Sequence, residues 1–84
     1  MKIKEQDIID LGFERVDDDD NGDPYHYYTL DIGNDYVPMC LITNSNDEAK
    51  EVNWSVTIFD YDSIELNDLD NLKSLVSLLQ NNVK

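Results

Sequence analysis

The side chains best suited to chemistry in this sequence are oxygen ligands, gathered in the run Asp17–Asp23 (DDDDNGD). Oxygens at alternate positions followed by glycine match the first half of an EF-hand loop, where such oxygens converge on a calcium ion. The candidate metal ligands are Asp17, Asp19, Asn21 and Asp23. The second half of the motif is missing, because Tyr28 stands where a bidentate glutamate would complete the shell. Since Asp, Asn and Gly are also common turn residues, the run predicts a solvated loop, and Ca²⁺ is the only cofactor it suggests.

The other reactive side chains are one histidine and one cysteine, His26 and Cys40. A nucleophilic cysteine needs a base within hydrogen-bond reach. In a hairpin centred on Asn34-Asp35, Cys40 would lie opposite Thr29 and His26 would lie on the other face, so the two would not meet. One histidine with one cysteine also cannot complete a zinc site. We therefore expect no enzymatic activity and no catalytic residue.

The charge of the chain indicates what kind of partner it could have. Nineteen acidic residues oppose six basic ones in 84 residues, which gives a formal net charge of −13. No basic residue lies between Arg15 and Lys50. Such a field repels nucleic acid and anionic membranes and favours a basic protein surface. Solubility alone would also account for an acidic surface.

Two kinds of side chain could contact a basic partner. Spaced carboxylates could imitate the phosphates of a nucleic-acid backbone, and tyrosines could add aromatic anchors. The predicted partner-binding residues are Asp17, Asp18, Asp19, Asp20, Asp23, Tyr25, Tyr27, Asp31 and Asp35. The sequence predicts a small acidic binding protein, which is either a general acidic interaction module or a decoy that occupies a basic, nucleic-acid-handling groove.

Short strands between two helices are expected to position these residues. A helix at Lys4–Leu11 ends at Gly12, which suits the left-handed residue after a helix. Apolar and β-branched patterns predict strands at Phe13–Val16, Tyr25–Ile32, Val37–Thr43 and Val52–Phe59, with a short edge strand at Ile64–Leu66. The intervening Asn44–Lys50 is predicted to be a polar loop.

The hairpin centred on Asn34-Asp35 has a preferred register, because it gathers apolar residues on one face. The predicted pairs are Tyr28 with Leu41, Leu30 with Met39, and Ile32 with Val37. The other face is mixed and only partly covered. It carries Tyr25, Tyr27, Thr29, Asp31, Cys40 and Ile42.

The last helix is predicted to begin at Asn67 or Asp68 and to run to about Asn82. Its apolar residues recur at spacings of three and four, as in an amphipathic helix. They are Leu69, Leu72, Leu75, Val76, Leu78, Leu79 and Val83. The predicted fold is a single α+β domain over residues 1–84. It is a small antiparallel β-meander of about four strands, with a short N-terminal helix and a C-terminal helix packed on one face.

Cysteine content and hydropathy point to a compartment. The lone Cys40 excludes an internal disulfide and fits a reducing environment. No stretch approaches the roughly 18–20 apolar residues needed to span a bilayer. The first ten residues (MKIKEQDIID) are too polar for the apolar part of a signal peptide. The sequence predicts a soluble, cytoplasmic protein with no membrane partner.

Several stretches of the chain resemble small acidic proteins of phage and prophage gene sets. They are Leu11–Glu14 (LGFE), Tyr27–Gly33 (YYTLDIG), Cys40–Asn44 (CLITN), Asn53-Trp54 and Ile58–Tyr61 (IFDY). The resemblance implies a mobile-element context, in which small acidic proteins often inhibit a host nuclease or another defence factor, some of them as DNA mimics. It assigns no functional residue.

Two other functions remain open from the sequence. One is an adaptor that binds through the apolar stripe of the last helix or through a sheet edge. The other is a calcium-responsive module that uses the four candidate ligands in Asp17–Asp23.

Overall fold

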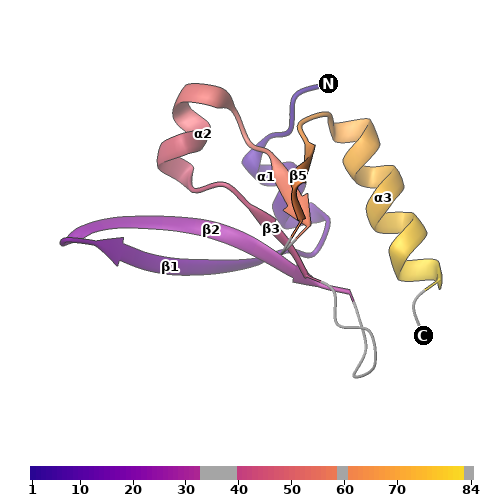
Figure 1. Ribbon diagram of the computed structural model, residues 1–84, viewed down its shortest axis with the longest axis horizontal. Helices are drawn as coiled ribbons and strands as arrows, with labels where there is room; N and C mark the ends of the chain where they lie inside the picture. Colours follow the sequence, from indigo (N-terminus) through magenta and orange to yellow (C-terminus); the bar gives the residue numbers. More distant parts are fainter. Residues whose placement is uncertain (33–39, 59–60, 83–84) are drawn as a thin grey trace.

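The computed structural model describes residues 1–32, 40–58 and 61–82. In this part of the chain five strands form one antiparallel sheet, in the order β1-β2-β3-β4-β5. The strands are β1 (Glu14–Asp20), β2 (Asp23–Asp31), β3 (Cys40–Thr43), β4 (Val56–Ile58) and β5 (Tyr61–Leu66), and the helices are α1 (Glu5–Asp10), α2 (Asn46–Val52) and α3 (Leu69–Asn82). The predicted α+β meander, with a helix before and after it, is confirmed, and α2 is an additional helix (Figure 1).

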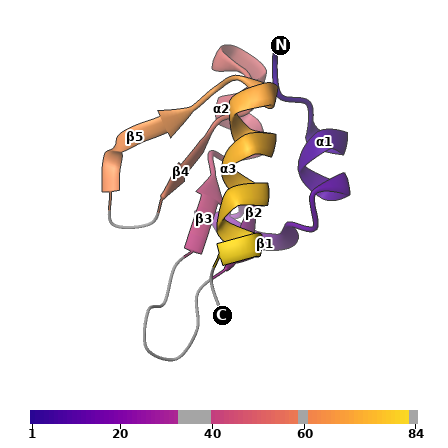
Figure 2. The ribbon, with the colours of Figure 1, turned by 90° about the vertical axis from the view of Figure 1, so that its right-hand side faces the viewer.

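Helices α1 and α3 lie on the same side of the sheet (Figure 2). The core between these helices and the sheet consists of Ile3, Ile8, Phe13, Tyr28, Leu41, Val56, Leu69, Leu72 and Val76. The predicted start of α3 is confirmed, because the carboxylate of Asp68 accepts a hydrogen bond from the backbone N–H of Asn71 at 3.1 Å. The apolar stripe of α3 faces the sheet: Leu72 is completely buried, while Leu78 on the outer side is 60% exposed.

Helix α1 ends as the sequence predicts. Leu11 is its C-cap residue, and Gly12 follows with φ +96°, a left-handed conformation that glycine adopts without a steric penalty. The chain then turns directly into β1. Phe13, in this turn, is buried in the core and fixes the start of the strand.

The register between β2 and β3 differs from the prediction by two residues. Leu41 pairs with Leu30, whereas the predicted hairpin placed it opposite Tyr28. Because side chains alternate between faces, a shift of two leaves each residue on its expected face. Tyr28 and Leu41 are accordingly both buried in the core. The other predicted pairs involve Met39 and Val37, which lie outside the described residues, as does the predicted turn.

The predicted loop at Asp17–Asp23 is wrong, because these residues form the end of a β-hairpin. Strand β1 continues to Asp20, which pairs with Asp23 across a two-residue turn. The turn residues Asn21 and Gly22 have φ +54° and +89°, the signature of a type I′ turn, whose twist matches that of the flanking strands. The Asn-Gly turn and the pairing with β2 therefore outweigh the low strand propensity of aspartate.

The predicted loop at Asn44–Lys50 is also wrong, since it contains most of α2. The hydroxyl of Ser45 accepts a hydrogen bond from the backbone N–H of Glu48 at 3.3 Å and donates one to the Glu48 carboxylate at 3.3 Å. This Ser-x-x-Glu pattern is that of a helix N-terminus. Because α2 extends to Val52, the predicted strand at Val52–Phe59 is shorter, and its described part is β4.

Candidate functional site

The most prominent feature of the surface is the end of the β1–β2 hairpin. Within the described residues, the pairing between β2 and β3 is limited to Thr29–Asp31 of β2, so the earlier part of β2 and the end of β1 extend past β3. In Figure 1 this part of the hairpin projects away from the rest of the molecule. We call residues 17–25 the acidic hairpin.

Carboxylates occupy both faces of the acidic hairpin. The cross-strand pairs on the core side are Asp17 with His26 and Asp19 with Pro24. On the other side, Asp18 lies opposite Tyr25, and Asp23 lies on that same face of β2. Asp17, Asp18, Asp19 and Asp23 are exposed. Arg15 is the one basic residue in the described strands, and its guanidinium pairs with Asp17 at 2.9 Å. Both partners are largely exposed, so water and salt screen this ion pair.

The hairpin separates the four candidate calcium ligands. Asp17 and Asp19 lie on one face, Asp23 lies on the other, and Asn21 is in the turn. Within the described residues, no group of three or more His, Cys, Asp or Glu side chains is placed to hold a metal ion. The calcium site stays a prediction, without a convergent set of ligands to support it.

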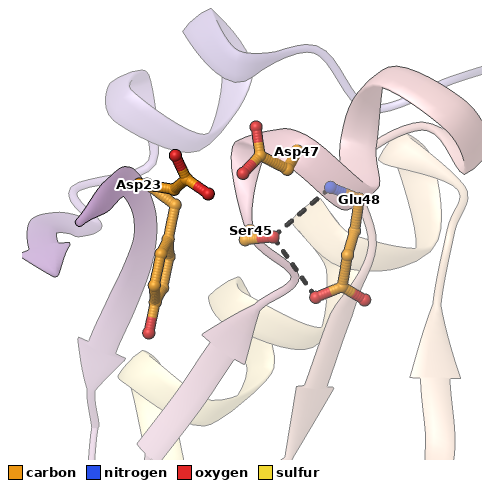
Figure 3. A pocket seen from close by; sticks show the side chains of 5 residues that line it. Asp23, Ser45, Asp47 and Glu48 are labelled. Atoms are coloured by element: carbon orange, nitrogen blue, oxygen red, sulfur yellow. Dashed lines mark hydrogen bonds between the residues drawn. The ribbon is translucent and has the colours of Figure 1, made fainter. Parts of the chain in front are cut away.

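Helix α2 adds carboxylates beside the acidic hairpin. The backbone N–H of His26 donates to the side-chain oxygen of Asn46 at 2.8 Å, which joins the start of α2 to β2. Between these elements is a hollow of about 370 Å³, lined by Asp23, Tyr25, Ser45, Asp47 and Glu48. Figure 3 shows the carboxylates of Asp23 and Asp47 directed toward the space between them. The negative surface therefore continues from the hairpin onto α2.

The two predicted aromatic anchors lie together on the face away from the core. The rings of Tyr25 and Tyr27 are stacked, with centroids 6.4 Å apart and planes at 24°. Both residues are half-buried. Val16 is directly opposite Tyr27, and Asp18 is directly opposite Tyr25. This arrangement places apolar surface next to the carboxylates of the hairpin.

The structure does not bring the remaining predicted partner-binding residues to the hairpin. Asp31 lies at the far end of β2, eight positions from Asp23, or about 27 Å along an extended strand. It is exposed and pairs with Cys40. Burial, and then hydrogen bonding to Asp31, raises the pKa of the Cys40 thiol. Asp35 lies outside the described residues.

Sequence reasoning missed a polar cluster at the base of the hairpin. The Glu5 carboxylate of α1 accepts a hydrogen bond from the Tyr28 hydroxyl at 2.6 Å and lies 2.6 Å from Nε2 of His26. The Trp54 ring packs at 5.7 Å from that of Tyr28 and 6.2 Å from that of His26. These contacts join α1 to β2 and fix where the hairpin leaves the core. The one sequence signal for this cluster is the alternation that puts His26 and Tyr28 on the core face.

The cluster shifts the pKa values of its own groups. Burial and the hydrogen bond to Glu5 raise the pKa of Tyr28 to about 12. Hydrogen bonds from Tyr28 and His26 hold the pKa of Glu5 below its ordinary value. Cys40 takes no part, because its partner Asp31 faces the opposite side of β2 from His26. The arrangement therefore stabilises an ionised Glu5 and provides no activated cysteine.

Part of the apolar stripe of α3 is used in the core. Leu69, Leu72 and Val76 are buried, while Leu78 is 60% exposed. An adaptor function would use this exposed part of the stripe or a sheet edge, at β1 or β5.

Comparison with known proteins gives no further guide to this site. No protein-family model, curated protein or solved structure matches the chain. None of the helices in the described part of the chain is long and apolar enough to cross a membrane.

Proposed function

We propose that this chain is a small, non-enzymatic binding protein whose acidic hairpin occupies the basic groove of a nucleic-acid-handling protein. The resemblance to phage proteins makes a host defence protein the natural target. The observation that carries the proposal is the projection of exposed aspartates on a hairpin beyond the rest of the sheet. A projecting element can enter a groove that the body of the molecule could not.

The spacing of these aspartates supports imitation of a nucleic-acid strand. An antiparallel strand rises about 3.4 Å per residue, and a single strand of DNA carries one negative charge per about 3.4 Å of helix axis. Residues 17–20 of β1 are all aspartate, so this segment has one carboxylate per residue. The charge per unit length along this segment therefore equals that of one DNA strand, over about 10 Å.

The hairpin is also pre-organised, which favours binding. Its Asn-Gly turn has the conformation that two-residue hairpins require, and its base is tied to α1 and α2 through His26. A rigid element loses less conformational entropy when it binds. Because the interaction is ionic and exposed, added salt should weaken it.

Capture from a host-cell lysate with three matched proteins tests the proposal. The hairpin variant carries Asp18→Asn, Asp19→Asn and Asp23→Asn. The control variant carries Asp10→Asn, Glu51→Gln and Asp70→Asn, which remove the same charge at other exposed positions. We expect the wild type and the control to capture basic nucleic-acid-binding proteins that salt or duplex DNA releases, and the hairpin variant to lose them.

Two results would contradict the proposal. The first is capture of the same proteins, in equal amounts, by the hairpin variant. The second is capture that neither high salt nor duplex DNA reverses, because an apolar interface would then dominate.

A further inference from the structure

One face of the sheet combines acidic and aromatic side chains and lacks basic ones. We call the face directed away from α1 and α3 the open face. Its described carboxylates come from Glu14, Asp18, Asp23, Asp31 and Glu65, as the cross-strand pairs show. Arg15, the basic residue of the described strands, lies opposite Tyr28 in the sheet and is therefore on the core side. Among the described residues, none on the open face is buried.

The stacked rings of Tyr25 and Tyr27 form an aromatic patch within this acidic face. Their centroids are 6.4 Å apart, and Val16, which lies opposite Tyr27, adds apolar surface to the patch. Asp18 lies directly opposite Tyr25. Residues directly opposite one another have Cβ atoms about 4.5–5.5 Å apart. A planar cation lying over the ring of Tyr25 would therefore be within reach of the Asp18 carboxylate.

Arginine fits this arrangement better than lysine. Its guanidinium is planar and weakly hydrated, stacks on aromatic rings, and pairs with a carboxylate through two parallel hydrogen bonds. The lysine ammonium is a compact and strongly hydrated charge. In an extended peptide, alternate residues on one face are about 6.8 Å apart. This spacing is close to the 6.4 Å between the centroids of the stacked tyrosine rings, so arginines at alternate positions could each contact one ring.

We infer that the open face binds an extended, arginine-bearing segment of the basic partner and prefers arginine to lysine through Tyr25 and Tyr27. The inference rests on the proposed function, since it names what the acidic protein recognises in its partner. Beside Tyr25, the hollow lined by Asp47 and Glu48 adds carboxylates next to this segment.

Two synthetic peptides of equal length and charge test the preference, one with arginine and one with lysine alternating with threonine. Their dissociation constants at low salt can be measured by fluorescence anisotropy. We expect the wild type to bind the arginine peptide about two to five times more tightly. In the Tyr25→Leu/Tyr27→Leu variant the ratio should fall to about one, because leucine keeps the apolar bulk and loses the aromatic ring. The Tyr25→Phe/Tyr27→Phe variant is the matched control and should keep the preference.

A second measurement uses the wild type and needs no variant. In an NMR titration, the ring protons of Tyr25 and Tyr27 should shift with the arginine peptide and less with the lysine peptide, while those of buried Tyr28 should not shift. Equal affinities for the two peptides, or an unchanged ratio in the leucine variant, would overturn the inference and leave the proposed function standing. Failure of both peptides to bind the wild type at low salt would overturn both.

Discussion

At the scale of single residues, Glu5 is the group that joins the hairpin to the body of the molecule. Its carboxylate accepts a hydrogen bond from the Tyr28 hydroxyl and lies beside Nε2 of His26. Both contacts lower the pKa of Glu5. A lowered pKa means that the contribution of Glu5 to stability is present above the ordinary pKa of 4.5 and is lost as the pH falls through the lower, folded-state value. The ionised form of Glu5 is therefore the stabilising one.

Glu5→Gln should destabilise the protein by about 1 kcal/mol at neutral pH, because a hydrogen-bonded carboxylate that is 40% exposed is replaced by an amide. The difference in free energy of unfolding between this variant and the wild type should shrink as the pH falls below 4.5. Urea unfolding at several pH values measures it, with Glu14→Gln as the control for loss of one exposed charge. A difference that does not change with pH would show that the ionised Glu5 is not what stabilises the cluster.

Tyr28 makes the stability depend on pH in the alkaline range, as Glu5 does in the acidic range. Its pKa is raised from 10.0 to about 12, so the folded state holds the phenol proton after the unfolded state has released it. The resulting stability is complete below pH 10 and is lost as the pH rises toward 12. We expect the stability of the wild type to fall over this range more steeply than that of Tyr28→Phe, as followed by circular dichroism. Parallel curves for the two proteins would show that folding does not raise the pKa of Tyr28.

At the scale of elements, the start of α2 depends on one side chain. Ser45→Ala removes the hydroxyl that accepts the N–H of Glu48, and should cost about 1 kcal/mol. The loss should appear as faster amide hydrogen exchange in α2 and in the adjoining part of β2. Ser74→Ala, at an exposed position inside α3, is the matched control and should be neutral or slightly stabilising. Equal effects of the two changes would show that Ser45 does not act as a cap.

The acidic hairpin depends on its turn in the same way. Gly22 has φ +89°, a conformation that costs alanine roughly 1 kcal/mol or more. Gly22→Ala should therefore speed amide exchange between residues 16 and 27 and weaken partner binding, with little change in the exchange of α3. Uniformly faster exchange across the molecule would instead mean that the hairpin and the core unfold together.

The elements show which features the sequence could predict. Periodicity predicts α3, because an amphipathic helix is a local pattern. The sequence offers Asn67 or Asp68 as its cap, and the structure shows Asp68. Polar composition predicts loops at Asp17–Asp23 and Asn44–Lys50, and both predictions are wrong. The Asn21-Gly22 turn and the Ser45–Glu48 capping pattern, which are also present in the sequence, are the local features that produce the hairpin and α2. The cluster of Glu5 with His26 is different. It joins residues 21 positions apart and arises only when α1 packs on the sheet.

The candidate site was predictable in part for the same reason. The aspartate run and the tyrosines that follow it are adjacent in the sequence, and the structure places them together on the β1–β2 hairpin. The hollow between the hairpin and α2 was not predictable, because it depends on α2, and the polar composition of Asn44–Lys50 predicts a loop there. The separation of Asp31 from the hairpin follows from the length of β2, which is predicted as Tyr25–Ile32 and observed as Asp23–Asp31.

At the scale of the whole molecule, a net charge of −13 on 84 residues opposes folding through self-repulsion. We expect the melting temperature to rise with NaCl, because salt screens exposed charges. The Asp18→Asn/Asp19→Asn/Asp23→Asn variant should be more stable than the wild type at low salt by about 0.5–1 kcal/mol, and the gain should vanish at high salt. The Asp10→Asn/Glu51→Gln/Asp70→Asn variant, whose changes lie on three separate helices, should gain less. Equal gains would mean that repulsion is spread evenly over the surface and is not concentrated in the hairpin.

Such concentrated repulsion is what a surface selected for binding would retain. Competition with DNA tests this central claim most directly. The affinity of this protein for a captured nucleic-acid-binding partner can be measured while duplex DNA is added in steps. We predict mutually exclusive binding, with an apparent dissociation constant that rises in proportion to the DNA concentration. A ternary complex, or an affinity that DNA leaves unchanged, would contradict the claim that the acidic hairpin takes the place of a nucleic-acid strand.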